Sequence, residues 1–140
     1  MNLPALAIGV LVAGLIIRGF KARRVEDSRW AYPALLATFP VYYWAFALLG
    51  ASLHALPAEI LAGMAFIAIA HVAAWRKNRG TQVALAIGYL AHGVYDIFHD
   101  HWVSNAGVPS WWPEFCGSVD LLVGAYLMLL ALRYRRVASA

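Results

Sequence analysis

Five long apolar stretches account for most of this chain of 140 residues. They cover residues 3–20, 30–53, 56–75, 82–99 and 113–132, and short polar segments separate them. About 20 mainly apolar residues suffice to cross a bilayer as a helix, which pairs its backbone polar groups internally. The sequence therefore predicts an all-α fold: a polytopic membrane protein in which one domain, residues 1–140, is a bundle of five transmembrane helices.

The composition and the charge indicate the same environment. Hydrophobic residues form 63% of the chain and charged residues 13%, whereas a soluble domain carries about 25% charged residues. The formal net charge of +4 would raise the question of a nucleic-acid partner in a soluble protein. Here the basic residues border the apolar stretches, so we expect the lipid bilayer as the partner and no nucleic acid.

The distribution of Lys and Arg predicts the orientation of the bundle. All 11 of these residues lie in or beside the segments that follow the first, third and fifth apolar stretches. They form three groups: Arg18, Lys21, Arg23, Arg24 and Arg29; Arg76, Lys77 and Arg79; and Arg133, Arg135 and Arg136. Because loops rich in Lys and Arg stay on the cytoplasmic side, we expect the C-terminus in the cytoplasm and the N-terminus outside.

Most side chains able to do chemistry lie between His92 and Asp120, in the sequence HGVYDIFHDHWVSNAGVPSWWPEFCGSVD. Helical geometry places His92, Asp96 and His99 on one stripe of the fourth stretch, with Asp120 at a similar depth in the fifth. An ionisable residue within a span costs about 2.5–3.5 kcal/mol, and it usually pairs with another or lines a functional cavity. Since every Lys and Arg lies at the other side, the counter-charge is a protonated histidine, a proton on a carboxyl group or a metal ion.

A divalent transition metal would neutralise several of these groups together. Imidazole and carboxylate groups both bind Zn²⁺ and similar ions, at about 2.0–2.2 Å. We therefore expect a site for zinc or a related metal, with the ligands His92, Asp96, His99 and Asp120. The spacing does not match a diagnostic zinc motif such as H-E-x-x-H, so the prediction depends on the residue types and their shared stripe.

An open position on such an ion would support hydrolysis, because metal-bound water can have a pKa of about 7 and act as a nucleophile. Asp100, His101 and Glu114 lie nearer the outer water interface, and we assign them as candidate catalytic general bases. The sequence thus favours an outward-facing, metal-dependent hydrolase that acts on a lipid or another amphipathic substrate.

Other functions stay open on the same residues. The stripe and Asp120 could form a hydrogen-bonded network that only holds the helices together, or a site from which a metal ion or a proton crosses the membrane. The chain could also be a non-catalytic subunit of a larger membrane complex, or a homo-oligomer. Cys116, one turn from Asp120, could be a soft metal ligand or, as free cysteines more often are, a small buried hydrophobe.

The C-terminal part of the chain resembles a bacterial family of small five-span integral membrane proteins whose function is not known. The residues that carry the resemblance are His92, Asp96, His99, the turn from Asn105 to Pro109, Cys116 and Asp120. This chain differs in having Asp100 where the family has the second His of a pair, with His101 following, and in having Ala106 after Asn105. The resemblance implies a bacterial inner membrane protein and supports the choice of site residues. It does not indicate which reaction, if any, the family catalyses.

Overall fold

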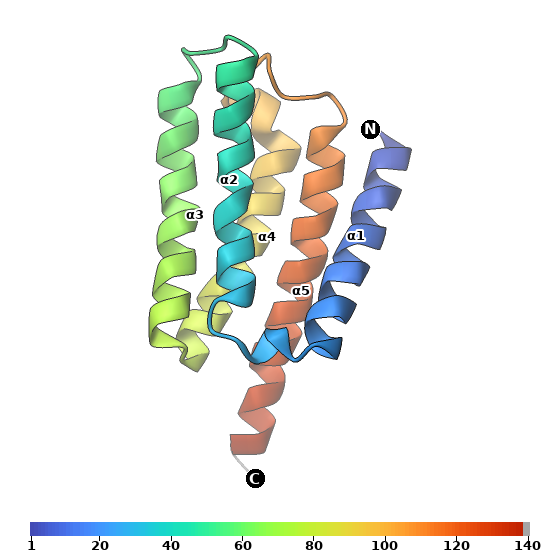
Figure 1. The fold of residues 1–140 in the computed structure, drawn as a ribbon, viewed down its shortest axis with the longest axis vertical. Helices are drawn as coiled ribbons and strands as arrows, with labels where there is room; N and C mark the ends of the chain where they lie inside the picture. Colours follow the sequence, from blue (N-terminus) through green and yellow to red (C-terminus); the bar gives the residue numbers. More distant parts are fainter. Residues whose placement is uncertain (139–140) are drawn as a thin grey trace.

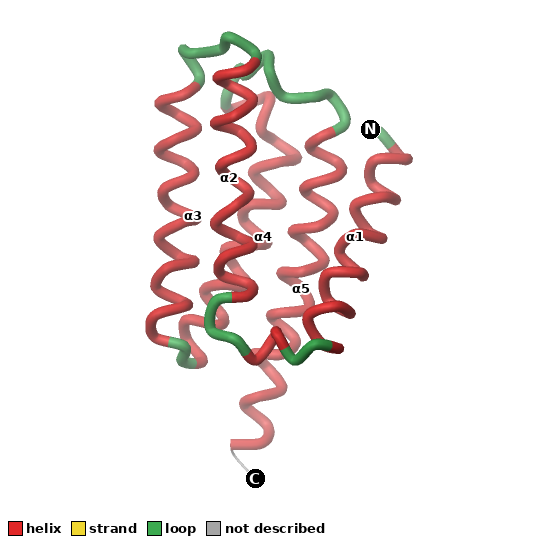
Figure 2. Tube along the Cα trace, viewed as in Figure 1, coloured by secondary structure: helices red, strands yellow, loops and turns green. Residues whose placement is uncertain are grey.

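The computed structural model describes residues 1–138, with side chains as far as Arg133, and it is all-α (Figures 1 and 2). Its elements are α1 (Leu3–Ala22), the short 3-10 helix η1 (Val25–Asp27), α2 (Ala31–Leu49), α3 (Leu56–Arg76), α4 (Arg79–Trp102) and α5 (Trp112–Ala138). Consecutive long helices run in opposite directions, so the connecting segments gather at the two ends of the bundle (Figure 1). Each predicted apolar stretch thus corresponds to one helix.

The second helix is shorter than the sequence predicted. We expected it over residues 30–53, but α2 ends at Leu49. The N–H group of Ser52 bonds back to the carbonyl of Ala47, at 2.8 Å, and Ala51 adopts a left-handed φ of 53°. This arrangement closes the helix in a C-terminal turn, and apolar residues beyond it belong to the loop that leads into α3.

Four of the helices, α1, α2, α3 and α5, are long and apolar enough to cross a membrane. They identify the chain as a membrane protein. α4 has 24 residues and is also long enough, but it is not one of the four, because His92, Asp96 and His99 lower its mean hydropathy. The polar content of α4 is therefore the main departure from an ordinary transmembrane bundle.

Glycines bring α4 and α5 close together. A Cβ atom added at Gly93 would lie 2.9 Å from Leu121 Cγ, and one added at Gly124 would lie 2.9 Å from Leu90 Cγ. Small residues at such positions allow the backbones of two transmembrane helices to approach. The close approach places the polar residues of α4 beside those of α5.

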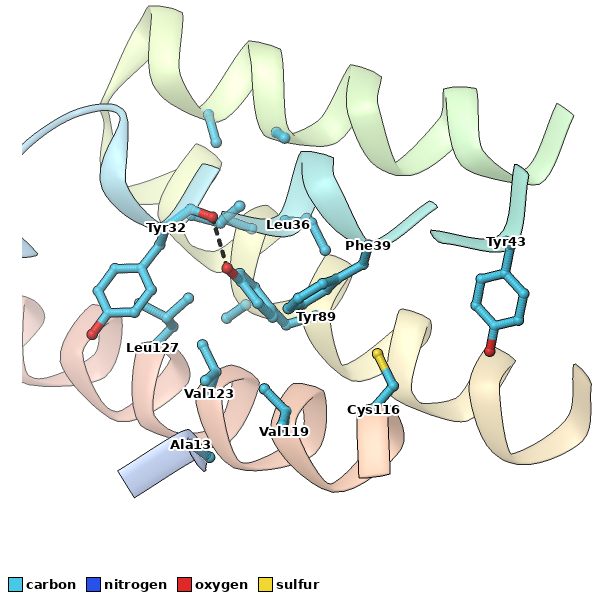
Figure 3. Close-up of a cluster of buried hydrophobic side chains, with 14 of the residues drawn as sticks. Ala13, Tyr32, Leu36, Phe39, Tyr43, Tyr89, Cys116, Val119, Val123 and Leu127 are labelled. Carbon is cyan, nitrogen blue, oxygen red and sulfur yellow. Dashed lines mark hydrogen bonds between the residues drawn. The ribbon is translucent and has the colours of Figure 1, made fainter. Parts of the chain in front are cut away.

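An apolar core lies between α2, α4 and α5 (Figure 3). Tyr32, Leu36 and Phe39 of α2 are buried against Tyr89 of α4 and Val123 of α5. The Tyr89 hydroxyl donates to the backbone carbonyl of Tyr32 at 2.7 Å, so the polar tip of this aromatic residue is satisfied. This core fills the half of the bundle nearer the basic loops, and the polar cluster lies beyond it toward the other end.

Candidate metal site

The polar stripe of α4 faces the interior of the bundle. α4 begins at a capping box, in which the Asn78 side chain accepts from the N–H group of Thr81. Its regular turns then bring His92, Asp96 and His99 to one side of the helix. All three residues are 0% exposed, so the stripe that the sequence predicted is a buried feature.

Two residues of α4 and two of α5 form one buried group, the four-residue cluster: His92, Asp96, Cys116 and Asp120. One potential ligand atom from each lies within 4.8 Å of the others. His92 Nδ1 lies 2.7 Å from Asp120 Oδ2 and 3.4 Å from Asp96 Oδ2. Because the two helices are antiparallel, each residue of α4 is matched in depth by one of α5, and the cluster spans a single helical turn.

Three polar atoms of this cluster are buried without a hydrogen-bond partner among the described residues. They are His92 Nε2, Asp96 Oδ2 and Asp120 Oδ1. A buried polar group left unpaired costs about 1–3 kcal/mol, and more when it is charged. Three such atoms on neighbouring side chains are unusual for a folded interior, and they show that the described residues do not use the full hydrogen-bonding capacity of the cluster.

The charges of the cluster point to a cation. Asp96 and Asp120 both direct a carboxylate oxygen at His92, which is their ion-pair partner among the described residues. One imidazolium cannot balance two carboxylates, and uncompensated charge in a water-free interior is expensive. A bound divalent ion would balance both carboxylates, or one carboxyl group must keep its proton.

The donor set fits a borderline metal such as Zn²⁺, which binds imidazole nitrogen, carboxylate oxygen and cysteine sulfur. Bond lengths of about 2.0–2.3 Å place tetrahedral zinc ligands about 3.5 Å apart. The widest separation in the cluster, within 4.8 Å, would therefore have to shorten by about 1 Å. His92 Nδ1 and Asp120 Oδ2, at 2.7 Å, would have to separate by a similar amount. The residues present therefore fit the ion by donor type and, to within about 1 Å, by spacing.

His99, which the sequence predicted as a fourth ligand, belongs to a different group. Its Nε2 atom lies 2.8 Å from Glu59 Oε1 of α3. The same oxygen accepts from Asn105 Nδ2 at 2.9 Å, and Glu59 Oε2 accepts from the hydroxyl of Tyr95 at 2.8 Å. Both carboxylate oxygens of Glu59 are thus satisfied. This Glu59 network joins α3, α4 and the loop after α4, and Cys116 takes the place in the cluster that we had expected for His99.

Tyr43 of α2 connects the two polar groups. Its hydroxyl donates to Asp96 Oδ1 at 2.6 Å, while its ring stacks on the His99 imidazole with the centroids 4.4 Å apart. Its backbone carbonyl also accepts from Asn105 Nδ2 at 3.2 Å. One tyrosine therefore orients a cluster carboxylate and supports the Glu59 network.

Glu59 has a role in the site that was not predicted from the sequence. It begins the third apolar stretch at the same end of the bundle as His99, and it is only 2% exposed. An acidic residue at the end of an apolar helix, away from the basic loops and with no cation near it in the sequence, was the available signal. Its partners could not be read from the sequence because α4 and the loop after it supply the donors, and only the packing of α3 against them brings these groups together.

The three predicted general bases lie outside the cluster. Asp100 has a side chain that is 76% exposed, with Oδ1 3.4 Å from His99 Nδ1, and His101 is also exposed. Glu114 accepts from the backbone N–H group of Asn2 at 2.9 Å, about 9 Å along α5 from Asp120. Catalytic roles for these residues stay predictions.

Comparison of the chain with known protein families, with curated proteins and with solved structures finds no match. The function is therefore argued from the chemistry of the site alone.

Proposed function

We propose that this chain is a five-span metalloprotein of a bacterial inner membrane, which binds one divalent transition metal, zinc in the first instance, at the four-residue cluster. The observation that carries the proposal is the buried grouping of His92, Asp96, Cys116 and Asp120, in which one potential ligand atom from each residue lies within 4.8 Å of the others. Three atoms of this group also lack a hydrogen-bond partner among the described residues. Nitrogen, oxygen and sulfur donors in this number are those that zinc uses in proteins.

Five spans are supported by the opposite face of α4. Ile87, Val94 and Ile97 are 52%, 42% and 49% exposed, while the His and Asp side chains of the same helix are buried. A helix with its polar residues in the bundle interior and its apolar residues outside is suited to a bilayer. Counting α4 as a span keeps the basic loops on one side, which favours a cytoplasmic C-terminus and an N-terminus outside.

If the bound metal is catalytic, the protein is a metal-dependent hydrolase that acts on a lipid or another amphipathic substrate. Four protein ligands make a closed, structural site, whereas three ligands and a water make a catalytic one. Cys116 favours the second form, because it belongs to the cluster and also borders an apolar cavity between helices. Release of Cys116 from the ion would open a position next to that cavity.

Transport of the ion across the membrane is the weaker alternative. A path needs polar groups at successive depths, and toward the basic loops the cluster is followed by the buried apolar core around Leu36, Tyr89 and Val123. The site is therefore proposed as one-sided.

The test is elemental analysis of detergent-purified protein prepared without a chelator. We expect about one equivalent of zinc or a related metal per chain, and its loss in Asp120→Asn, which keeps the size of the side chain. Glu114→Gln is the matched control at the same helix and should retain the metal. Wild-type protein that is folded and metal-free would contradict the proposal, and the cluster would then be a hydrogen-bonded network.

A further inference from the structure

A long apolar groove lies between α1, α2 and α5, with a volume of about 760 Å³. Among the side chains that the structure describes, those lining the groove carry no charge. Its walls include Ile8, Val12 and Ile16 of α1, Leu35 and Phe39 of α2, and Val119 of α5. These helices are apolar enough to span a membrane, so the groove lies within the bilayer. The molecules available to fill it there are membrane lipids.

The groove meets the four-residue cluster at Cys116 and lies close to it at Phe39. Cys116 lines the groove and is also a member of the cluster. Phe39 lines the groove on one side, and its ring lies 5.6 Å from the His92 imidazole, centroid to centroid. Figure 3 shows Phe39 and Cys116 in the same region of the core. Whatever fills the groove therefore lies one side chain away from the cluster.

The length and width of the groove suit a single lipid acyl chain. On α1 it extends from Pro4 to Ile16, which is about 18 Å along the helix and about 3 Å more than the ~15 Å of one leaflet of hydrocarbon. A peptide helix of that length, about 10 Å across, would need roughly twice the available volume. A single hydrocarbon chain is narrow enough to fit.

The outer end of the groove is polar. Asn2 and Pro4 line both the apolar groove and a neighbouring cavity of about 500 Å³, which Ser110 and Glu114 also border. An apolar channel one leaflet deep, with a polar space at its mouth, matches an amphipathic molecule whose headgroup stays at the interface.

We propose that this groove binds one acyl chain of an outer-leaflet membrane lipid, and that Cys116 is where the bound chain adjoins the metal site. Binding of the chain stands on the groove alone, whereas its place beside a metal rests on the function proposed above. A lipid substrate then reaches the cluster laterally from the bilayer, by entering the groove between α1 and α2.

The probe is phosphatidylethanolamine with a photoactivatable diazirine on one acyl chain, in vesicles of phosphatidylethanolamine and phosphatidylglycerol. We expect cross-links on peptides that contain groove residues of α1 and α5. Ile8→Trp, at a 54% exposed position in the groove wall, should reduce them several-fold. Val10→Trp is the matched control, because Val10 is 42% exposed on the same helix and does not line the groove. Cross-links spread evenly over the lipid-facing helices, or unchanged in Ile8→Trp, would overturn the groove.

Measuring the same samples for metal separates the two proposals. Groove cross-linking that persists after chelation, or in metal-free protein, supports the lipid site whether or not the cluster binds a metal. Absence of groove cross-linking in wild-type protein that retains its metal overturns the lipid site and does not affect the metal site. An apolar maleimide should modify Cys116 in delipidated, chelated protein, and added lipid should slow the reaction. An equal rate with and without lipid would contradict the contact at Cys116.

Discussion

His92 and Asp120 join α4 to α5 through a contact of 2.7 Å between Nδ1 and Oδ2, at a point where both side chains are buried. A second histidine, His99, meets Glu59 at 2.8 Å one level further out. The two pairs look alike, but their surroundings differ. Glu59 has a donor for each oxygen, whereas Asp120 leaves Oδ1 unpaired. The His99–Glu59 pair is therefore suited to holding the helices together, and the His92–Asp120 pair belongs to the site that we propose for a metal ion.

Tyr43→Phe should weaken metal binding without removing any ligand. The change deletes the hydroxyl that donates to Asp96 Oδ1 at 2.6 Å, and loss of such an outer-shell partner typically lowers metal affinity about 10–100-fold. Titration of the chelated protein with Zn²⁺ against a competing chelator measures the affinity. Tyr42→Phe, at a 46% exposed position of the same helix, is the control. Equal affinities for the two variants would show that Tyr43 does not orient the ligand.

Glu59→Gln should destabilise the protein and leave its metal content unchanged. Removing the charge from a buried ion pair costs about 3–5 kcal/mol, and here the His99 imidazole would lose its partner. Thermal unfolding in detergent, together with metal analysis, checks this. If the variant lost its metal while its unfolding temperature stayed the same, the Glu59 network would belong to the metal site.

Gly124→Leu should separate α4 from α5 and lower stability by about 1–3 kcal/mol, as overpacking does. A Cβ atom at this position would already lie 2.9 Å from Leu90 Cγ and 3.0 Å from the Leu90 backbone nitrogen. Gly14→Leu on α1 is the matched control, because nothing lies within 4 Å of a Cβ atom there. The unfolding temperatures of the two variants in detergent measure the difference. Similar values would mean that the glycine contact is not needed for the α4–α5 packing.

Single cysteines at the two ends of the bundle test the orientation. Ser110→Cys should react in intact cells with a maleimide that cannot cross the membrane, and Ser28→Cys should react only after the cells are opened. Both positions are exposed, and the native Cys116 is buried, so the wild-type chain gives the background. The reverse pattern would place the basic loops outside, against the positive-inside rule.

Much of the fold was predictable because it depends on local properties of the chain. The helices follow from runs of apolar residues near the length of a bilayer. Their ends were less predictable: α2 ends at Leu49 where we expected 53, and α5 continues to Ala138 where we expected 132. The polar stripe of α4 was predictable as well, since the spacing of His92, Asp96 and His99 fixes their side of the helix.

The membership of the site was decided by tertiary structure. His92 and His99 share a face but lie seven residues apart, about 10.5 Å along the helix axis, which is too far for both to bind one ion at about 2 Å. The cluster residue that takes the place expected for His99 is Cys116 of α5, because close packing at Gly93 and Gly124 brings α5 against the polar stripe of α4. The periodicity of a sequence determines which side chains share one helix face, whereas the packing of neighbouring helices determines which faces meet.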